Sequence, residues 1–335
     1  MGLPQLKILF SSEVLPWERK AVEGISEHLA PNCEFTIDEI SPSKRGLLAS
    51  ATGPTWIISN RWRETLKFVG AYKTSFPVFV SIIHPTHYHP SWYQMMLNKV
   101  VDEIPRNIEF VVHSEFNLRY LNELEGIPKS KIHYLPFGQP VVEPLLKKED
   151  PTFTVGGFAS FESESNLSHQ MSIAHYLKSK GSNIQFKIFG TGELYRHLKV
   201  QTWEMQLENT VSIIETNDVS LLSQVDLLLH LPIRQDHFLP VLYSACANIP
   251  VIASEGLGIG SYITDSHDGF ILPVNNTRLF AEMILRLSKD AQLRTGLATQ
   301  LKNSISKKFS WAEIIPSYEK VFFGIQTLQT QTRAA

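Results

Sequence analysis

The sequence of 335 residues is 43% hydrophobic and 19% charged, the composition of a globular protein long enough for two domains. A formal net charge of −2 argues against a surface built to bind nucleic acid. No apolar stretch is long enough for a transmembrane helix, and the start of the chain does not resemble a secretory signal. Cys33 and Cys246 form no disulfide framework, which favours a reduced, cytoplasmic setting.

Short apolar segments alternate with helical segments along the first half of the chain. Glu18 to Leu29 places apolar residues at helical spacing, and Glu115 to Leu124 also has helical character. Between them lie runs that end at polar residues or proline, a pattern typical of buried parallel strands. These predicted strands are Leu6–Ser11, Thr55–Asn60, Val78–His84, Glu109–Ser114 and Ile132–Gly138.

A proline-rich, charged segment, Pro140–Pro151, predicts a linker. Beyond it the alternation resumes, with helices expected around His169–Lys178, from Leu194, near Val219–Gln224 and from Thr277. The strands of this half are FTVGGFA, IQFKIFGTG, NTVSIIE, VDLLLHLP, PVIASEG and DGFILPV. The last apolar stretch, FSWAEIIPSYEKVFFGI, predicts an amphipathic helix that is broken at Pro316 and lies back across the first half.

Two tandem halves of this kind predict an α/β protein with two doubly wound, Rossmann-like domains facing each other across a cleft. We place these domains at residues 1–145 and 146–310, and residues 311–328 form the helix that returns to the first domain. In parallel sheets ligands bind at the carboxyl ends of the strands. The segment RQDHFLPVLYSACANIPVIASEGLG, a polar loop followed by a helix, a strand and a glycine loop, is therefore a candidate ligand site.

Three histidines lie close together in the loop HPTHYHPSW, after the third predicted strand. Metal binding is one interpretation of His84, His87 and His89, contact with a donor or acceptor is a second, and plain loop surface is a third. Pro85 and Pro90 hold this loop extended, which disfavours a metal cage.

Several segments resemble the GT-B glycosyltransferases of the retaining family 4 type. HSEFNLRYLNELEGIPKSKIHYLPFGQP resembles the end of their N-terminal domain. In the second half, TVGGF resembles the first donor-domain loop and NTVSIIE resembles the strand that lines the base pocket. The other matching segments, in order, are FKIFGTGEL, VDLLLHLP, ACANIPVIASEGLG, DGFILPVNNTRLFAEMI and FSWAEIIPSYEKVF. The resemblance runs from about Val78 to Phe322.

The resemblance implies an acceptor site in the first domain and a nucleotide-sugar site in the second. His84 and Asp236 take the catalytic positions nearest the reaction centre. On the acceptor side the candidates are Glu13, Trp17 and His87. The family needs no bound metal, and we expect no cofactor beyond the nucleotide-diphosphate sugar that serves as donor substrate. The donor-binding positions are Gly156, Gly157, Phe158, Ser160, Gly190, Thr191, Gly192, Ile214, His237, Phe238, Leu239 and Ser244.

The chain departs from the family pattern within this donor site. Gly157 stands where the family has an arginine directed at the phosphates, and the following FASFESESN contains no lysine. Ser244 stands where a glutamate holds the ribose, so a hydroxyl remains but the charge-assisted, bidentate hold on a diol is lost. Asp236 keeps a carboxylate at the other end of this motif.

Two functions follow from this mixture. The first is a retaining, metal-independent glycosyltransferase of polysaccharide biosynthesis that acts on a glycan, lipid-linked or protein acceptor. The second is a catalytically inactive GT-B homologue that serves as a partner subunit or binding module. We expect a cytoplasmic protein that binds no nucleic acid. Peripheral contact with the inner membrane face is an alternative that would use Arg61 to Lys73, a segment that is otherwise typical of an ordinary surface helix.

Overall fold

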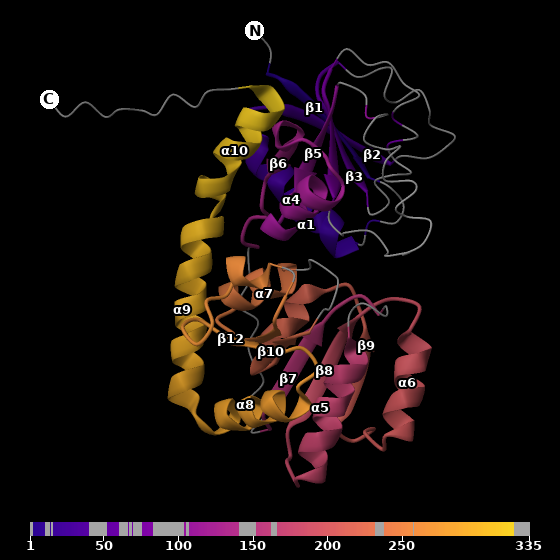
Figure 1. Ribbon diagram of the computed structural model, residues 1–335, viewed down its shortest axis with the longest axis vertical. Coiled ribbons are helices and arrows are strands. Elements are labelled where there is room, and N and C mark those ends of the chain that lie inside the picture. Colours follow the sequence, from indigo (N-terminus) through magenta and orange to yellow (C-terminus); the bar gives the residue numbers. More distant parts are fainter. Residues whose placement is uncertain are drawn as a thin grey trace, which may run out of the picture. The chain divides into compact units, whose positions relative to one another are not determined.

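In the computed structural model the chain forms two compact units (Figure 1). Unit 1 comprises Met1–Gly138 and Phe309–Ala335, and unit 2 comprises Gln139–Lys308. The division of labour expected of these units, acceptor side and nucleotide-sugar side, stays a prediction. The described residues are 3–10, 14, 16–39, 52–59, 66, 69, 76–82, 104, 107–140, 152–161, 166–231, 238–256 and 258–324.

Unit 1 contains a six-stranded parallel sheet in the order β2-β1-β3-β4-β5-β6. The continuous apolar runs predicted as strands coincide with β1, β3, β4, β5 and β6 because these strands are buried between helices. The sequence did not predict β2, a mostly exposed edge strand without such a run. The strands are β1 (Gln5–Phe10), β2 (Glu34–Glu39), β3 (Thr55–Ser59), β4 (Val78–Ile82), β5 (Ile108–Val112) and β6 (Ile132–Tyr134).

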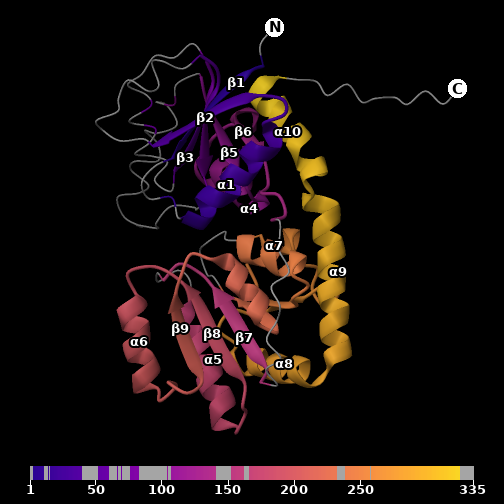
Figure 2. The same cartoon turned by 180° about the vertical axis from the view of Figure 1, so that it is seen from behind.

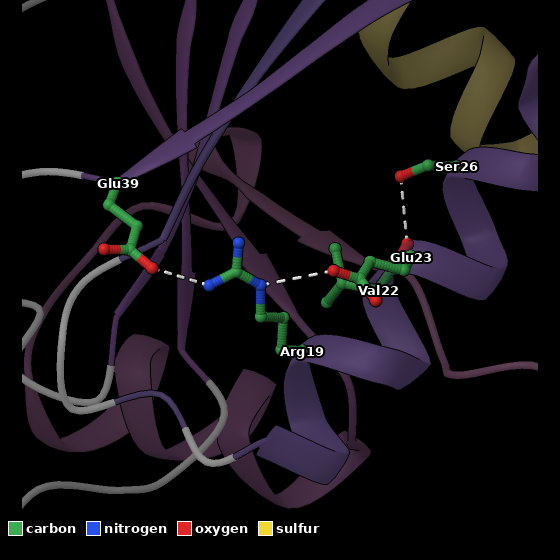
Figure 3. A network of polar contacts seen from close by, with 5 residues as sticks. All are labelled: Arg19, Val22, Glu23, Ser26 and Glu39. Carbon is green, nitrogen blue, oxygen red and sulfur yellow. Dashed lines mark hydrogen bonds and ion pairs between the residues drawn. The ribbon is translucent and has the colours of Figure 1, made fainter.

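Helix α1 (Pro16–Leu29) buries Val22, Ile25 and Leu29, as its apolar spacing predicts. Arg19 on its first turns links the helix to the sheet (Figure 3). The guanidinium donates to Glu23 Oε1 at 3.2 Å and to Glu39 Oε1, at the end of β2, at 2.7 Å. Later in the unit, α4 (Glu115–Arg119) is capped by the Ser114 side chain and continues as a π-helical turn, Tyr120–Leu124.

The C-terminal helix α10 (Trp311–Phe323) belongs to unit 1. The predicted break at Pro316 is wrong, since α10 runs through that residue and the helical backbone is instead interrupted at Ser310, where φ is −63° and ψ is 148°. A proline inside a helix costs about 3 kcal/mol. Aromatic packing offsets this cost, because the ring of Phe322 lies 5.1 Å from that of Trp56 and 5.0 Å from that of Phe79.

A chain of buried polar contacts runs beneath α10. The Trp56 indole N–H donates to Ser81 Oγ at 2.8 Å, and Ser81 Oγ lies 3.0 Å from His113 Nε2. His113 Nδ1 lies 2.7 Å from the Leu135 carbonyl, which accepts only, so the proton is on Nδ1. Tyr318 O–H donates to the same carbonyl at 3.0 Å. Burial lowers the pKa of His113 to about 4, against the opposing effect of the bond to Leu135, and so keeps the ring neutral.

Unit 2 contains a second six-stranded parallel sheet, in the order β12-β11-β10-β7-β8-β9 (Figure 2). Helices α5 and α8 pack together on one face (Figure 1) and cover Val155, Phe186 and Ile188. The strands are β7 (Thr154–Phe158), β8 (Gln185–Gly190), β9 (Val211–Glu215), β10 (Leu227–His230), β11 (Val251–Ser254) and β12 (Phe270–Leu272). The helices are α5 (Leu167–Ser179), α6 (Tyr195–Glu204), α7 (Leu239–Cys246), α8 (Thr277–Lys289) and α9 (Ala291–Phe309).

Replacing Tyr318 with phenylalanine should destabilise the protein by about 1–2 kcal/mol. The change removes only a hydroxyl that is fully buried and that donates to the Leu135 and Pro136 carbonyls. Urea unfolding measures the loss. Tyr176→Phe on α5, a half-buried tyrosine, is the matched control and should change stability by less than about 0.5 kcal/mol. Equal effects of the two changes would show that α10 does not depend on this contact.

Candidate functional site

The strand order of unit 2 places a topological switch point between β7 and β10. From β7 the chain adds β8 and β9 on one side and β10, β11 and β12 on the other. Ligands of doubly wound sheets bind in the crevice at the carboxyl ends of the strands that flank this point. The candidate site is therefore the carboxyl edge formed by the ends of β7, β8, β9 and β10 together with the start of α7.

The loop after β7 and the Gly-Thr-Gly turn after β8 are tied to each other. The amides of Ala159 and Phe161 donate to the Phe189 and Thr191 carbonyls at 3.1 and 2.8 Å. Gly190 has φ of 153°, and a Cβ there would lie 1.8 Å from the Ala159 carbonyl oxygen. Only glycine fits this position. The predicted donor-binding residues Gly190, Thr191 and Gly192 thus also fix the shape of this edge.

The predicted donor-binding positions at the end of β7 lie inside the strand and not in a loop. Gly156, Gly157 and Phe158 are buried and pair with β8, and the loop begins at Ala159. A Cβ on Gly157 would lie 2.5 Å from Gln170 Oε1 and 2.6 Å from Gln170 Nε2. The carboxamide of Gln170, on α5, therefore fills the space that a side chain at position 157 would need.

Helix α7 presents its first turn to the same edge. Phe238 precedes the helix and its side chain makes no capping bond, so among the described residues the first N–H groups, to which Pro240 adds none, are left for other acceptors. Pro240 in the first turn restricts the backbone there. The Phe238 ring stacks on Tyr262 at 4.2 Å, which holds the start of the helix. Ser244 is fully buried in α7, and its hydroxyl has no hydrogen-bond partner among the described residues.

Sequence reasoning missed His230, the last residue of β10. Its side chain is 5% exposed, its Nε2 has no partner within the described part of the chain, and its ring lies 6.2 Å from that of Phe238. Burial lowers the pKa of His230 to about 3, so the imidazole is neutral at physiological pH. It lies in the run LLLHLP, which is typical of uniform core, and no local signal distinguishes it.

Asn217, after β9, was also missed. Thr191 Oγ1 lies 3.0 Å from Asn217 Oδ1, a bond that joins the loops after β8 and β9. The predicted base-pocket residue Ile214 lies near the end of β9 and pairs in register with Phe189. These contacts bring Thr191, Ile214 and Asn217 to one end of the carboxyl edge.

Five predicted positions, namely Glu13, His84, His87, Asp236 and His237, lie outside the described residues. Trp17 has its backbone in the first turn of α1, and its side chain is likewise outside the description. Leu239 is the first residue of α7, and Ser160 is buried in the loop after β7. Across the described segments, no three histidine, cysteine or acidic side chains come together as a metal site, and no helix is long and apolar enough to cross a bilayer.

Residues 143–304 match the family model Glycosyl transferases group 1. An uncharacterized glycosyltransferase of Methanocaldococcus jannaschii, MJ1178, is 30% identical over 151 residues, which cover 43% of this chain and 41% of that protein. The N-acetyl-alpha-D-glucosaminyl L-malate synthase of Bacillus anthracis is 24% identical over 111 residues, or 33% of this chain and 29% of the synthase. The matches thus span less than half of these curated relatives.

Among solved structures, Anabaena Alr3699/HepE in complex with UDP and glucose is similar over 95% of this chain and 99% of its own, with a TM-score of 0.74 and 14% identity. A point mutant of TarM from S. aureus, solved in complex with UDP among other ligands, has a TM-score of 0.67 and 15% identity over 80% of this chain and 55% of its own. At this identity the likeness shows the fold, which is GT-B as the resemblance implied.

Gly190→Ala should disrupt the site. The new Cβ would overlap the Ala159 carbonyl, so the loops after β7 and β8 must separate, at a cost of about 3 kcal/mol or more. Gly181→Ala is the control, because Gly181 also has positive φ, of 74°, but a Cβ there meets nothing within 4 Å. It should cost only about 1 kcal/mol. Urea unfolding of both variants separates steric overlap from backbone strain, and similar losses would contradict the overlap.

His230 should make stability depend on pH. Its folded pKa of about 3 lies below the unfolded value of 6.5, so the unfolded chain takes up the proton first as the pH falls. The contribution is fully present above pH 6.5 and is lost progressively towards pH 3. Between pH 6.5 and 4.5, wild type should lose roughly 2–3 kcal/mol more than His230→Leu in urea unfolding. The exposed His175→Leu is the control and should follow wild type, whereas identical curves for all three would refute this origin.

Proposed function

We propose that this chain, of which residues 143–304 match the glycosyl transferases group 1 family, moves a sugar from a nucleotide-diphosphate sugar to a glycan, lipid-linked or protein acceptor, with retention and without a metal. The observation that carries the proposal is the carboxyl edge at the switch point of unit 2. There, two interlocked loops and the open first turn of α7 face the crevice in which doubly wound sheets bind nucleotides.

The start of α7 is the group proposed to stabilise the leaving diphosphate. The first amides of a helix lack intrahelical acceptors, and the helix dipole adds a partial positive charge there. Such an end binds phosphate without a cation. This supports transfer without a metal, because charge that develops on the leaving group meets donors that are already in place.

The roles of the remaining residues are proposed from the resemblance. Asp236 would orient the sugar hydroxyls, His84 would lie near the reaction centre, and Glu13, Trp17 and His87 would contact the acceptor. The resemblance places Ser244 at the ribose, where its hydroxyl, which is fully buried and has no partner in the described chain, replaces a carboxylate. Cytoplasmic location, peripheral membrane contact and a part in polysaccharide biosynthesis are parts of the same proposal.

The described residues of the donor site supply few formal charges. Gly157 and Gln170 leave no space for a cation at the end of β7, and Ser244 contributes no charge. Neutral hydrogen bonds are each worth about half of charge-assisted ones. We therefore place the dissociation constant for the free nucleotide above that of a site with the full set of charged residues. The loss of these charged residues also favours the second candidate function, that of an inactive homologue that binds a partner.

Thermal unfolding with millimolar UDP, GDP, ADP and CDP tests nucleotide binding. A nucleotide at 100 times its dissociation constant adds about 2.7 kcal/mol, which raises the midpoint by roughly 2–4 °C or more. A shift with one base supports the transferase. No shift with any nucleotide or nucleotide sugar would favour the inactive homologue.

Release of nucleotide from the matching nucleotide sugar tests catalysis. Asp236→Ala and His84→Ala should lower kcat at least about 100-fold while the nucleotide shift persists, because the resemblance places both residues at the sugar and not at the base. Glu208→Ala, an exposed residue between α6 and β9, is the control with unchanged kcat. Full turnover in both test variants would overturn their assignment.

A further inference from the structure

We propose that Asn217, held by Thr191, selects the nucleobase of the donor and admits a base with a keto group at its outer edge, uracil or guanine, over cytosine or adenine. The inference rests on the proposed function. It assigns the choice of nucleobase to one side chain at the β9 end of the candidate site.

The Thr191–Asn217 contact determines how the amide is oriented. A threonine hydroxyl can donate to an amide oxygen, and Thr191 Oγ1 lies 3.0 Å from Asn217 Oδ1. The amide nitrogen then faces away from Thr191 and carries two protons without a protein acceptor among the described residues. Asn217 is exposed, so these protons are accessible to a ligand. The pair thus presents a donor, and not an acceptor, at this point of the edge.

The backbone around the pair is fixed. The Thr216 amide donates to the Gly190 carbonyl at 2.9 Å, and the Thr191 carbonyl accepts from the Phe161 amide at 2.8 Å. The Asp218 amide donates to Thr216 Oγ1 at 3.0 Å, which closes the turn after β9. A side chain that reads a base must be held in this way, because selectivity depends on a donor that cannot turn to become an acceptor.

The place of the pair in the sheet suits a base. The diphosphate is proposed at the switch point between β7 and β10, and β9 lies two strands from β7. Neighbouring strands are about 4.8 Å apart, so the β9 end lies about 10 Å along the edge. A nucleoside diphosphate covers such a distance from its phosphates to the far edge of its base. The three strands β7, β8 and β9 form one mononucleotide-binding half of a doubly wound sheet.

The chemistry of the base edges then decides the preference. Uracil at O4 and guanine at O6 offer acceptors, whereas cytosine and adenine carry amino donors at the corresponding positions. An amino group facing the Asn217 amide leaves two donors opposed and unpaired. A site that is built to pair with a group rejects analogues lacking it by more than size alone does. UDP and CDP share the sugar, the phosphates and the ring, and differ only in the group on C4 and the proton on N3 beside it, which makes them the sharpest pair for a test.

The test is isothermal titration of the full chain with UDP, CDP, GDP and ADP. Wild type should bind UDP at least tenfold more tightly than CDP, or GDP at least tenfold more tightly than ADP. Whichever of UDP and GDP binds with the lower dissociation constant identifies the base of the donor. Asn217→Asp replaces the amide donor with an acceptor of the same shape. It should lower the keto-to-amino affinity ratio at least tenfold. The ratio cancels the repulsion between the new charge and the diphosphate, which both nucleotides carry.

Two further variants make the test specific. Thr191→Val frees the amide to rotate and should bring the ratio close to one. Asn209→Asp makes the same change at an exposed position before the amino end of β9, and should leave the ratio at its wild-type value. A normal unfolding midpoint for Asn217→Asp shows that the variant folds.

The outcomes separate the two proposals. An unchanged ratio in Asn217→Asp, or a wild type that prefers CDP and ADP, overturns the role of Asn217 and leaves the nucleotide site standing. Absence of binding by every nucleotide to wild type overturns the proposed function, and the role of Asn217 with it.

Discussion

The carboxyl edge of unit 2 depends on one close approach, between the backbone after β7 and the backbone at the end of β8. The Ala159 carbonyl lies where a side chain on Gly190 would have to be, and two amides of the same loop donate across the gap. That contact holds Thr191 against the loop after β9 and so places Asn217. Without it the strands would still form a sheet, but the loops at their ends would have no fixed relation to a ligand.

Neutral groups stand at three places in the described part of this edge. Gln170 occupies the space beside Gly157, Ser244 carries a hydroxyl within α7, and His230 is uncharged because of its burial. A helix end and oriented amides still supply a field for an anion, and they do so without the desolvation cost of buried cations. A site of this kind holds its ligand through geometry more than through net charge, and its binding should depend little on salt.

The strands were predictable where they are buried on both faces, because continuous apolar runs leave little alternative. The exposed edge strand β2 has no such run. The helix break expected at Pro316 does not occur, because aromatic packing between α10 and the sheet, which no local sequence pattern reveals, stabilises the helix. In the site, the glycines after β8 could be recognised from the sequence. The requirement for glycine at position 190 could not, because it comes from the Ala159 carbonyl in the loop after β7, which precedes it by a helix and a strand. His230 is hidden in an apolar run. Asn217 acquires meaning only through Thr191, which is 26 positions away.

Because α10 belongs to unit 1, that unit is begun first by the ribosome and finished last. Trp56 and Phe79 are made early, yet the rings that cover them, Tyr318 and Phe322, emerge only after the whole of unit 2. At typical rates of translation the interval is roughly ten to fifty seconds. During that time the sheet of unit 1 exposes an aromatic surface, so the nascent chain is a natural client for chaperones. A chain that terminates before α10 would leave this surface open for good.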